Sequence, residues 1–154
     1  MIDINNESGR MADEKGLVRL ARFALDILHI HPEAELSIQL VDEATMSAYH
    51  EKFMGEPGPT DVLSFPMDEL RPGKPNGEEP LGVLGDVVLC PEVTERQAAD
   101  TGRTPRQEAE YLLIHGILHL LGFDHGEPQE KAVMFGLNDQ IIEAWTKESR
   151  SANA

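Results

Sequence analysis

The stretch TPRQEAEYLLIHGILHLLGFDH, residues 104–125, carries the strongest helix signal in the chain. Thr104 is a favoured N-cap, Pro105 suits the first helical position, and Gln107 completes a capping box with Thr104. Leucine and isoleucine then cover most of the helix surface, so the helix is expected to be buried. Gly122 is placed to end it in the left-handed conformation. The stretch therefore predicts a buried helix that the chain leaves by a sharp turn.

Three histidines around the end of this helix form a candidate metal site. His115 and His119 are four residues apart, so their side chains lie on one face of the helix. His125 follows Gly122 by three residues and can turn back toward the other two. Three neutral imidazoles leave one position of a tetrahedral zinc open for water, which is typical of a catalytic zinc rather than a structural one. We expect one Zn²⁺, held by His115, His119 and His125.

The residues between the histidines bear on the reaction. In H-E-x-x-H metalloproteases the glutamate after the first histidine is the general base, and here that position is Gly116. Peptide hydrolysis needs that base, whereas phosphodiester hydrolysis can depend more on the metal. The sequence thus favours another hydrolase, with a metalloprotease as a weaker alternative. Asp124 could orient an imidazole or assist the metal-bound water, although a turn residue at a helix end explains it equally well.

The remainder of the chain predicts one α+β domain. Periodic runs indicate further helices, and alternating or apolar runs indicate short strands. Strands are expected at 2–5, 35–41, 61–65 and 83–90, and further helices at 13–30, 43–53, 91–102 and 128–146. Because strands and helices do not alternate strictly, a small mixed sheet packed with about five helices is favoured over a doubly wound fold. Residues 1–148 are expected to form this domain, and 149–154 a flexible tail.

Composition limits the possible partners. The chain has 154 residues, with 13 lysines and arginines against 28 acidic residues, a net charge of −15. Binding nucleic acid through bulk positive charge is thereby excluded, and an RNA partner would need local cations or a metal. Local cations are present at Lys15, Arg19 and Arg22 on one helix face, although an ordinary solvated face explains them as well. Arg96, Arg103 and Arg106 could add to them if the fold brings these residues near the zinc.

The expected compartment is the cytoplasm. The single cysteine, Cys90, cannot form an internal disulfide and fits a reducing environment, and it is expected to be a small buried hydrophobic residue. The N-terminal residues lack a signal pattern, and the longest apolar stretch is too short to span a bilayer. We expect no membrane partner.

Three blocks of sequence resemble the YbeY family of bacterial endoribonucleases. They are the histidine block at 115–125, PTDVLSFP at 59–66 and LGDVV at 84–88, in the family's order. The resemblance implies a zinc-dependent, single-strand-specific endoribonuclease that matures the 3′ end of 16S rRNA in the cytoplasm and acts in ribosome quality control. It also implies contact with a protein of the small ribosomal subunit.

One departure from the family pattern concerns the mechanism. Many members have an arginine, treated as catalytic, where this chain has Met54, and a thioether cannot stabilise charge on a transition state. Lys52 could substitute from nearby, and Thr60, Asp61 and Ser64 are further candidates for substrate contact. The alternative is a ribosome-assembly factor that binds rRNA and a small-subunit protein with little catalysis.

Overall fold

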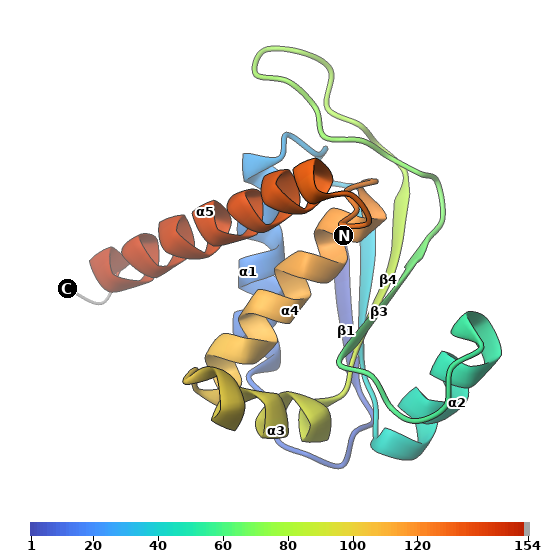
Figure 1. Ribbon diagram of the computed structural model, residues 1–154. Coiled ribbons are helices and arrows are strands. Elements are labelled where there is room, and N and C mark those ends of the chain that lie inside the picture. The colour runs from blue at the N-terminus through green and yellow to red at the C-terminus, as the bar shows by residue number, and fades with distance from the viewer. Residues whose placement is uncertain (153–154) are drawn as a thin grey trace.

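A four-stranded mixed sheet forms the centre of the protein. The computed structural model describes residues 1–152 (Figure 1). The strands are β1 (Ile2–Asn6), β2 (Glu35–Leu40), β3 (Val62–Pro66) and β4 (Val83–Leu89), in the order β1-β2-β4-β3. β1, β2 and β4 are parallel, and β3 pairs antiparallel with β4 at the edge. The mixed sheet predicted from the sequence is confirmed.

Five helices complete the α+β domain. They are α1 (Glu14–Ile27), α2 (Glu43–Met54), α3 (Pro91–Thr101), α4 (Pro105–Leu120) and α5 (Pro128–Ala152). Figure 1 shows α1, α4 and α5 on one side of the sheet and α2 on the other. α5 continues through 149–152, part of the segment for which a flexible tail is predicted, and 153–154 lie outside the described residues.

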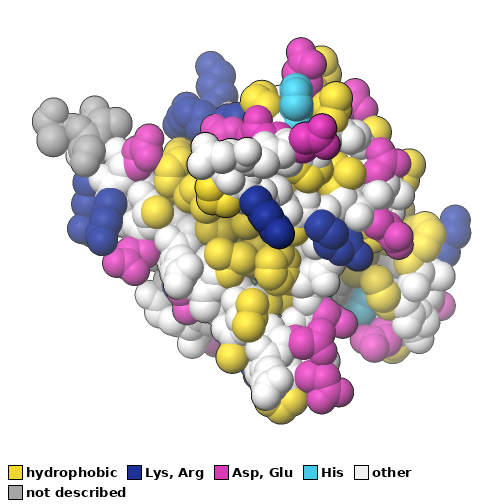
Figure 2. Space-filling model, turned by 90° about the horizontal axis from the view of Figure 1, so that it is seen from above, with side chains coloured by type: hydrophobic (Ala, Val, Ile, Leu, Met, Phe, Trp, Pro, Cys, Tyr) yellow, Lys and Arg dark blue, Asp and Glu magenta, His cyan; other side chains and the backbone are white. Residues whose placement is uncertain are grey.

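The connection from β3 to β4 is long, and it is bonded to the turn after α1: the Gly73 N–H donates to the Leu28 carbonyl and the His31 N–H to the Pro80 carbonyl, both at 3.0 Å. Residues 67–82 contain no helix or strand and extend as a long loop beyond the sheet (Figure 1). Over residues 1–152, no helix has both the length and the apolar character needed to cross a bilayer. Acidic side chains are spread over the face seen in Figure 2, with lysine and arginine side chains scattered among them and not gathered into one basic patch.

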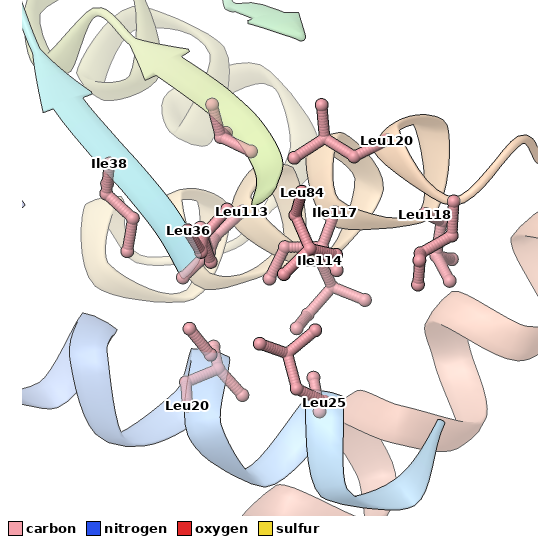
Figure 3. Packing of buried hydrophobic residues seen from close by; sticks show 14 of the residues in the cluster. Leu20, Leu25, Leu36, Ile38, Leu84, Leu113, Ile114, Ile117, Leu118 and Leu120 are labelled. Carbon is pink, nitrogen blue, oxygen red and sulfur yellow. The ribbon is translucent and has the colours of Figure 1, made fainter. Parts of the chain in front are cut away.

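The main core lies between the sheet and the three helices on its covered side. Figure 3 shows Leu20 and Leu25 of α1 and Leu36 of β2 directed toward Ile114 and Ile117 of α4. All five side chains are essentially inaccessible to solvent. Each such side chain contributes roughly 1.5–3 kcal/mol when it leaves water. Because α4 is packed against the sheet, α1 and α5, it is a rigid support for the histidines at its end.

A smaller cluster covers the opposite face of the sheet. Met46 of α2 packs there with Leu63, Val88 and Cys90. Cys90 is a free, buried thiol, as the sequence predicts, and its burial raises the pKa of that thiol.

Candidate metal centre

The two ends of α4 have the capping predicted from the sequence. Thr104 Oγ1 accepts a hydrogen bond from the Gln107 backbone at 3.1 Å, and Gln107 Oε1 accepts one from the Thr104 backbone at 3.0 Å. At the other end, Gly122 has φ +93°, and its N–H donates to the His119 carbonyl at 3.0 Å. The Phe123 N–H donates to the Leu118 carbonyl, which completes a Schellman motif. This turn reverses the chain toward the helix it has just left.

The reversal brings the three predicted histidines together. One ring nitrogen each from His115, His119 and His125 lies within 4.8 Å of the others. The ring centroids are 4.7 Å apart for His115 and His119, 5.1 Å for His119 and His125, and 5.5 Å for His115 and His125. The rings are therefore close enough to share one ion.

The pKa values of His115 and His119 favour the neutral form of both rings, which is the form that binds a cation. Burial, followed by the neighbouring His119 and His125, lowers the pKa of His115 to about 4 against the opposing effect of Asp61. Burial and His125 also lower the pKa of His119. Both imidazoles are therefore neutral at pH 7, with lone pairs free for a metal.

The donor set fits a divalent transition metal. Nδ1 of His115 is buried and has no hydrogen-bond partner among the described residues. A buried nitrogen in that state needs a ligand, because leaving it unpaired costs about 1–3 kcal/mol. Three neutral imidazoles are a ligand set that suits zinc and related ions.

The histidines open into a hollow of about 390 Å³, here called the histidine hollow. Its other walls are Met54 at the end of α2, Asp61, and residues 62–64 and Pro66 of β3. Among the described residues, no lysine or arginine lines it. Charge on a bound anion would therefore be met mainly by the metal.

Of the four predicted substrate-contact residues, two line the histidine hollow and two do not. Asp61 and Ser64 line the histidine hollow. Ser64 Oγ donates to the Gly116 carbonyl at 2.9 Å, so its hydroxyl joins β3 to α4. Asp61 Oδ1 accepts from the Val62 N–H at 2.7 Å, and the Thr60 hydroxyl reaches the same oxygen at 3.4 Å. Thr60 thus acts through Asp61 and does not line the hollow.

Lys52 and Asp124 lie outside the lining of the histidine hollow. The Lys52 ammonium stands 5.3 Å from the centroid of the Phe53 ring. Asp124 Oδ1 accepts from the His125 N–H at 2.7 Å, and its charge opposes the lowering of the His119 pKa. The carboxylate of Asp124 therefore shapes the turn that carries His125.

Gly116 explains why the protease glutamate is missing. A Cβ at this position would lie 2.6 Å from Val87 Cγ1, 3.2 Å from Ser64 Oγ and 3.2 Å from Val62 Cγ2. α4 thus lies directly against β3 and β4 at this point, and no glutamate fits between them. The steric constraint supports the inference against a metalloprotease.

Phe135 and Tyr111 lie near the histidines and were not predicted from the sequence, whereas Arg103 was named there as a cation that the fold could bring close. Phe135 of α5 has its ring centroid 5.8 Å from that of His115 and 6.0 Å from that of His125. Tyr111 and Arg103 lie on the far side of His115, where the tyrosine precedes it by one helical turn. That spacing of four was the available signal for Tyr111, whereas the position of Phe135 depends on how α5 packs. Its neighbour Met134 is fully buried in the core.

Comparison with known proteins agrees with this architecture. The sequence profile described as Endoribonuclease YbeY matches residues 3–146. This chain belongs to the endoribonuclease YbeY family. Family membership indicates a nuclease, a hydrolase of phosphodiester bonds.

Similar proteins cover nearly the whole chain. It is 71% identical to the Endoribonuclease YbeY of Cutibacterium acnes over 94% of both chains. It is 56% identical to that of Thermobifida fusca over 95% of this chain and 94% of the relative. The solution structure of TM1509 from Thermotoga maritima matches with a TM-score of 0.68 at 28% identity, covering 99% of this chain and 93% of the other.

Proposed function

We propose that the protein is a zinc-dependent endoribonuclease that cuts single-stranded RNA, with the precursor of 16S rRNA as its substrate. Its role would be 3′-end maturation and ribosome quality control in the cytoplasm, in contact with a protein of the small ribosomal subunit. The observation that supports this proposal best is the convergence of three imidazoles on an open hollow in a member of an endoribonuclease family.

The proposed chemistry divides between the metal and the chain. Zinc held by His115, His119 and His125 would polarise a phosphoryl oxygen and lower the pKa of a water molecule. Asp61 lines the histidine hollow, and its Oδ1 is already bonded to the Val62 N–H. Its Oδ2 is therefore the oxygen we assign to accept a proton during attack. Asp124 is assigned the positioning of His125.

The test is cleavage of a single-stranded RNA oligonucleotide by the purified protein. Elemental analysis should find one zinc ion per chain. Chelation should reduce the cleavage rate at least 100-fold, and added zinc should restore it. His115→Ala should lose both metal and cleavage, and zinc should not rescue it. A duplex of the same sequence should be cut more slowly. Equal cleavage by the variant and the parent would show a contaminating nuclease and would contradict the proposal.

One observation favours a second candidate function, that of a ribosome-assembly factor. Met54 gives the histidine hollow an apolar wall, and no lysine or arginine lines it. Such a site could retain RNA binding with little turnover. The same experiment separates the two functions, because an assembly factor would bind the oligonucleotide and the metal without cutting the RNA.

A further inference from the structure

A second hollow adjoins the histidine hollow across His115. It also measures about 390 Å³, within the range of about 300–1,000 Å³ found for small-molecule sites. Asp61, Val62 and His115 line both hollows, so the two hollows are adjacent. Its other walls include Tyr111 and Phe135, and we call it the aromatic hollow.

The wall formed by Arg103 is held in one conformation. The Arg103 guanidinium carbon lies 4.2 Å from the centre of the Tyr111 ring. Arg103 Nη1 donates to Glu108 Oε1 at 2.9 Å, and the Thr101 hydroxyl donates to the other oxygen of that carboxylate at 3.0 Å. The Glu108 side chain is only 3% exposed, whereas that of Arg103 is 39% exposed. A flat cation is thus fixed over a ring while part of its surface remains open to solvent.

The charges of the aromatic hollow select among possible ligands. Asp61, Asp100 and Glu108 line it together with Arg103, so carboxylates outnumber cations three to one. A phosphate would be repelled by this lining. A neutral, planar group with polar edges fits better, because nucleobases stack on aromatic rings and on arginine planes. Gln97 also lines the hollow, and its amide can meet such edges.

We propose that the aromatic hollow binds a nucleobase of the RNA chain, beside the phosphate held at the metal centre. This inference rests on the proposed endoribonuclease function. Phe135 packs against His115 and His125, so a base in this hollow lies next to the reacting phosphodiester. Arg103 stacks on the base and thereby sets which bond reaches the histidines.

The experiment uses an RNA oligonucleotide whose cleavage site has been mapped with the parent protein. Each nucleotide flanking the scissile bond is replaced in turn by an abasic residue. Loss of a stacked base should weaken binding and slow cleavage by about 5- to 150-fold at one flanking position. Fluorescence anisotropy measures binding independently of cleavage. If the parent shows no abasic penalty at any position, the proposal is wrong.

Arg103→Lys is the decisive variant, because it keeps the charge opposite Glu108 but removes the planar surface. It should bind and cut normal and abasic RNA equally well. Tyr111→Leu, which removes the ring under the guanidinium, should behave in the same way. Arg106→Lys is the matched control, since Arg106 pairs with Asp13 outside this hollow, and it should keep the full abasic penalty. Tyr111→Phe, which retains the ring, should also keep it.

The outcomes separate a binding role from a structural one. Thermal unfolding and metal content should show that each variant is folded and loaded. If folded Arg103→Lys keeps the parent's abasic penalty, the Arg103–Glu108 pair only joins α3 to α4 and the base site is refuted. If the parent neither binds nor cuts single-stranded RNA, the proposed function fails as well, which is a different result.

Discussion

Gly116 determines how closely the histidine helix approaches the sheet. The absence of a Cβ lets α4 lie against Val87 of β4. The Gly116 carbonyl accepts a hydrogen bond from the Ser64 hydroxyl of β3. His115 is the preceding residue, so the same contact positions its backbone. A side chain at position 116 would push the helix, and with it the metal ligands, away from the wall formed by β3.

Gly116→Ala should therefore lower the free energy of unfolding by about 1–3 kcal/mol, because the added methyl overlaps Val87. Chemical denaturation measures the effect. Adding Val87→Ala should cost less in this background than in the parent, since it relieves the overlap. The matched control is Gly136→Ala in α5, where a Cβ meets nothing within 4 Å. This control should be neutral or stabilising by about 0.5–1 kcal/mol. Simple additivity of the two substitutions would contradict the steric argument.

Asp61 is the carboxylate best placed for proton transfer. Asp61→Asn should lower the rate of RNA cleavage by about 10²–10⁴-fold while metal content stays at the parent level. The amide oxygen can still accept the Val62 N–H, so the loop should keep its shape. Asp124→Asn is the control, and it should reduce cleavage much less, since Asp124 does not line the histidine hollow. A larger loss in the Asp124 variant would reverse the assignment.

At the scale of elements, α4 was predictable because its signals are local. The capping box, the apolar periodicity and Gly122 all lie within residues 104–122, and each was found as predicted. The convergence of the three histidines was predictable for the same reason, because they lie within eleven residues of one another, at 115–125. The wall that Phe135 forms in the aromatic hollow could not be predicted, because Phe135 reaches the histidines only through the packing of α5 on α4. The contact of Arg103 with Tyr111 depends in the same way on the turn between α3 and α4.

Thr104→Ala should destabilise the protein by about 0.5–2 kcal/mol through the loss of the N-cap of α4. The metal site lies at the other end of the helix, so zinc affinity should stay near that of the parent. Urea denaturation and a metal-binding titration measure the two effects. Thr146→Ala serves as control, because the hydroxyl of Thr146 only bonds back to the Ile142 carbonyl on the exposed side of α5. A stability loss as large in this control would argue against capping as the cause.

At the scale of the whole molecule, the excess of acidic residues and the partly buried His115 and His119 both set how the protein responds to charge. The net charge of −15 gives no general attraction to RNA, so we expect recognition to depend on local sites such as the two adjoining hollows. The same histidines couple folding to pH. Their pKa values lie below the ordinary value of 6.5 in the folded protein, so the unfolded chain binds more protons between about pH 6.5 and 4.

The metal-free protein should thus have its full histidine-linked stability above pH 6.5 and lose it as the pH falls toward 4. For His115, whose folded pKa is about 4, the loss should amount to roughly 1–3 kcal/mol. Urea denaturation in the presence of a chelator at pH 7, 5.5 and 4.5 measures it. Acidic residues titrate in the same window, so the comparison is with His115→Gln, which should show a smaller slope. Parallel curves for the two proteins would refute the linkage.

All three candidate ligands come from residues 115–125, on either side of a single glycine turn. A cation held there closes only a very short loop, and the entropy of closing a loop increases with its length. Such an ion does not cross-link parts of the chain that are distant in sequence. Chelation should accordingly abolish RNA cleavage while the circular dichroism spectrum at pH 7 is unchanged, because the apoprotein is already folded before the metal binds.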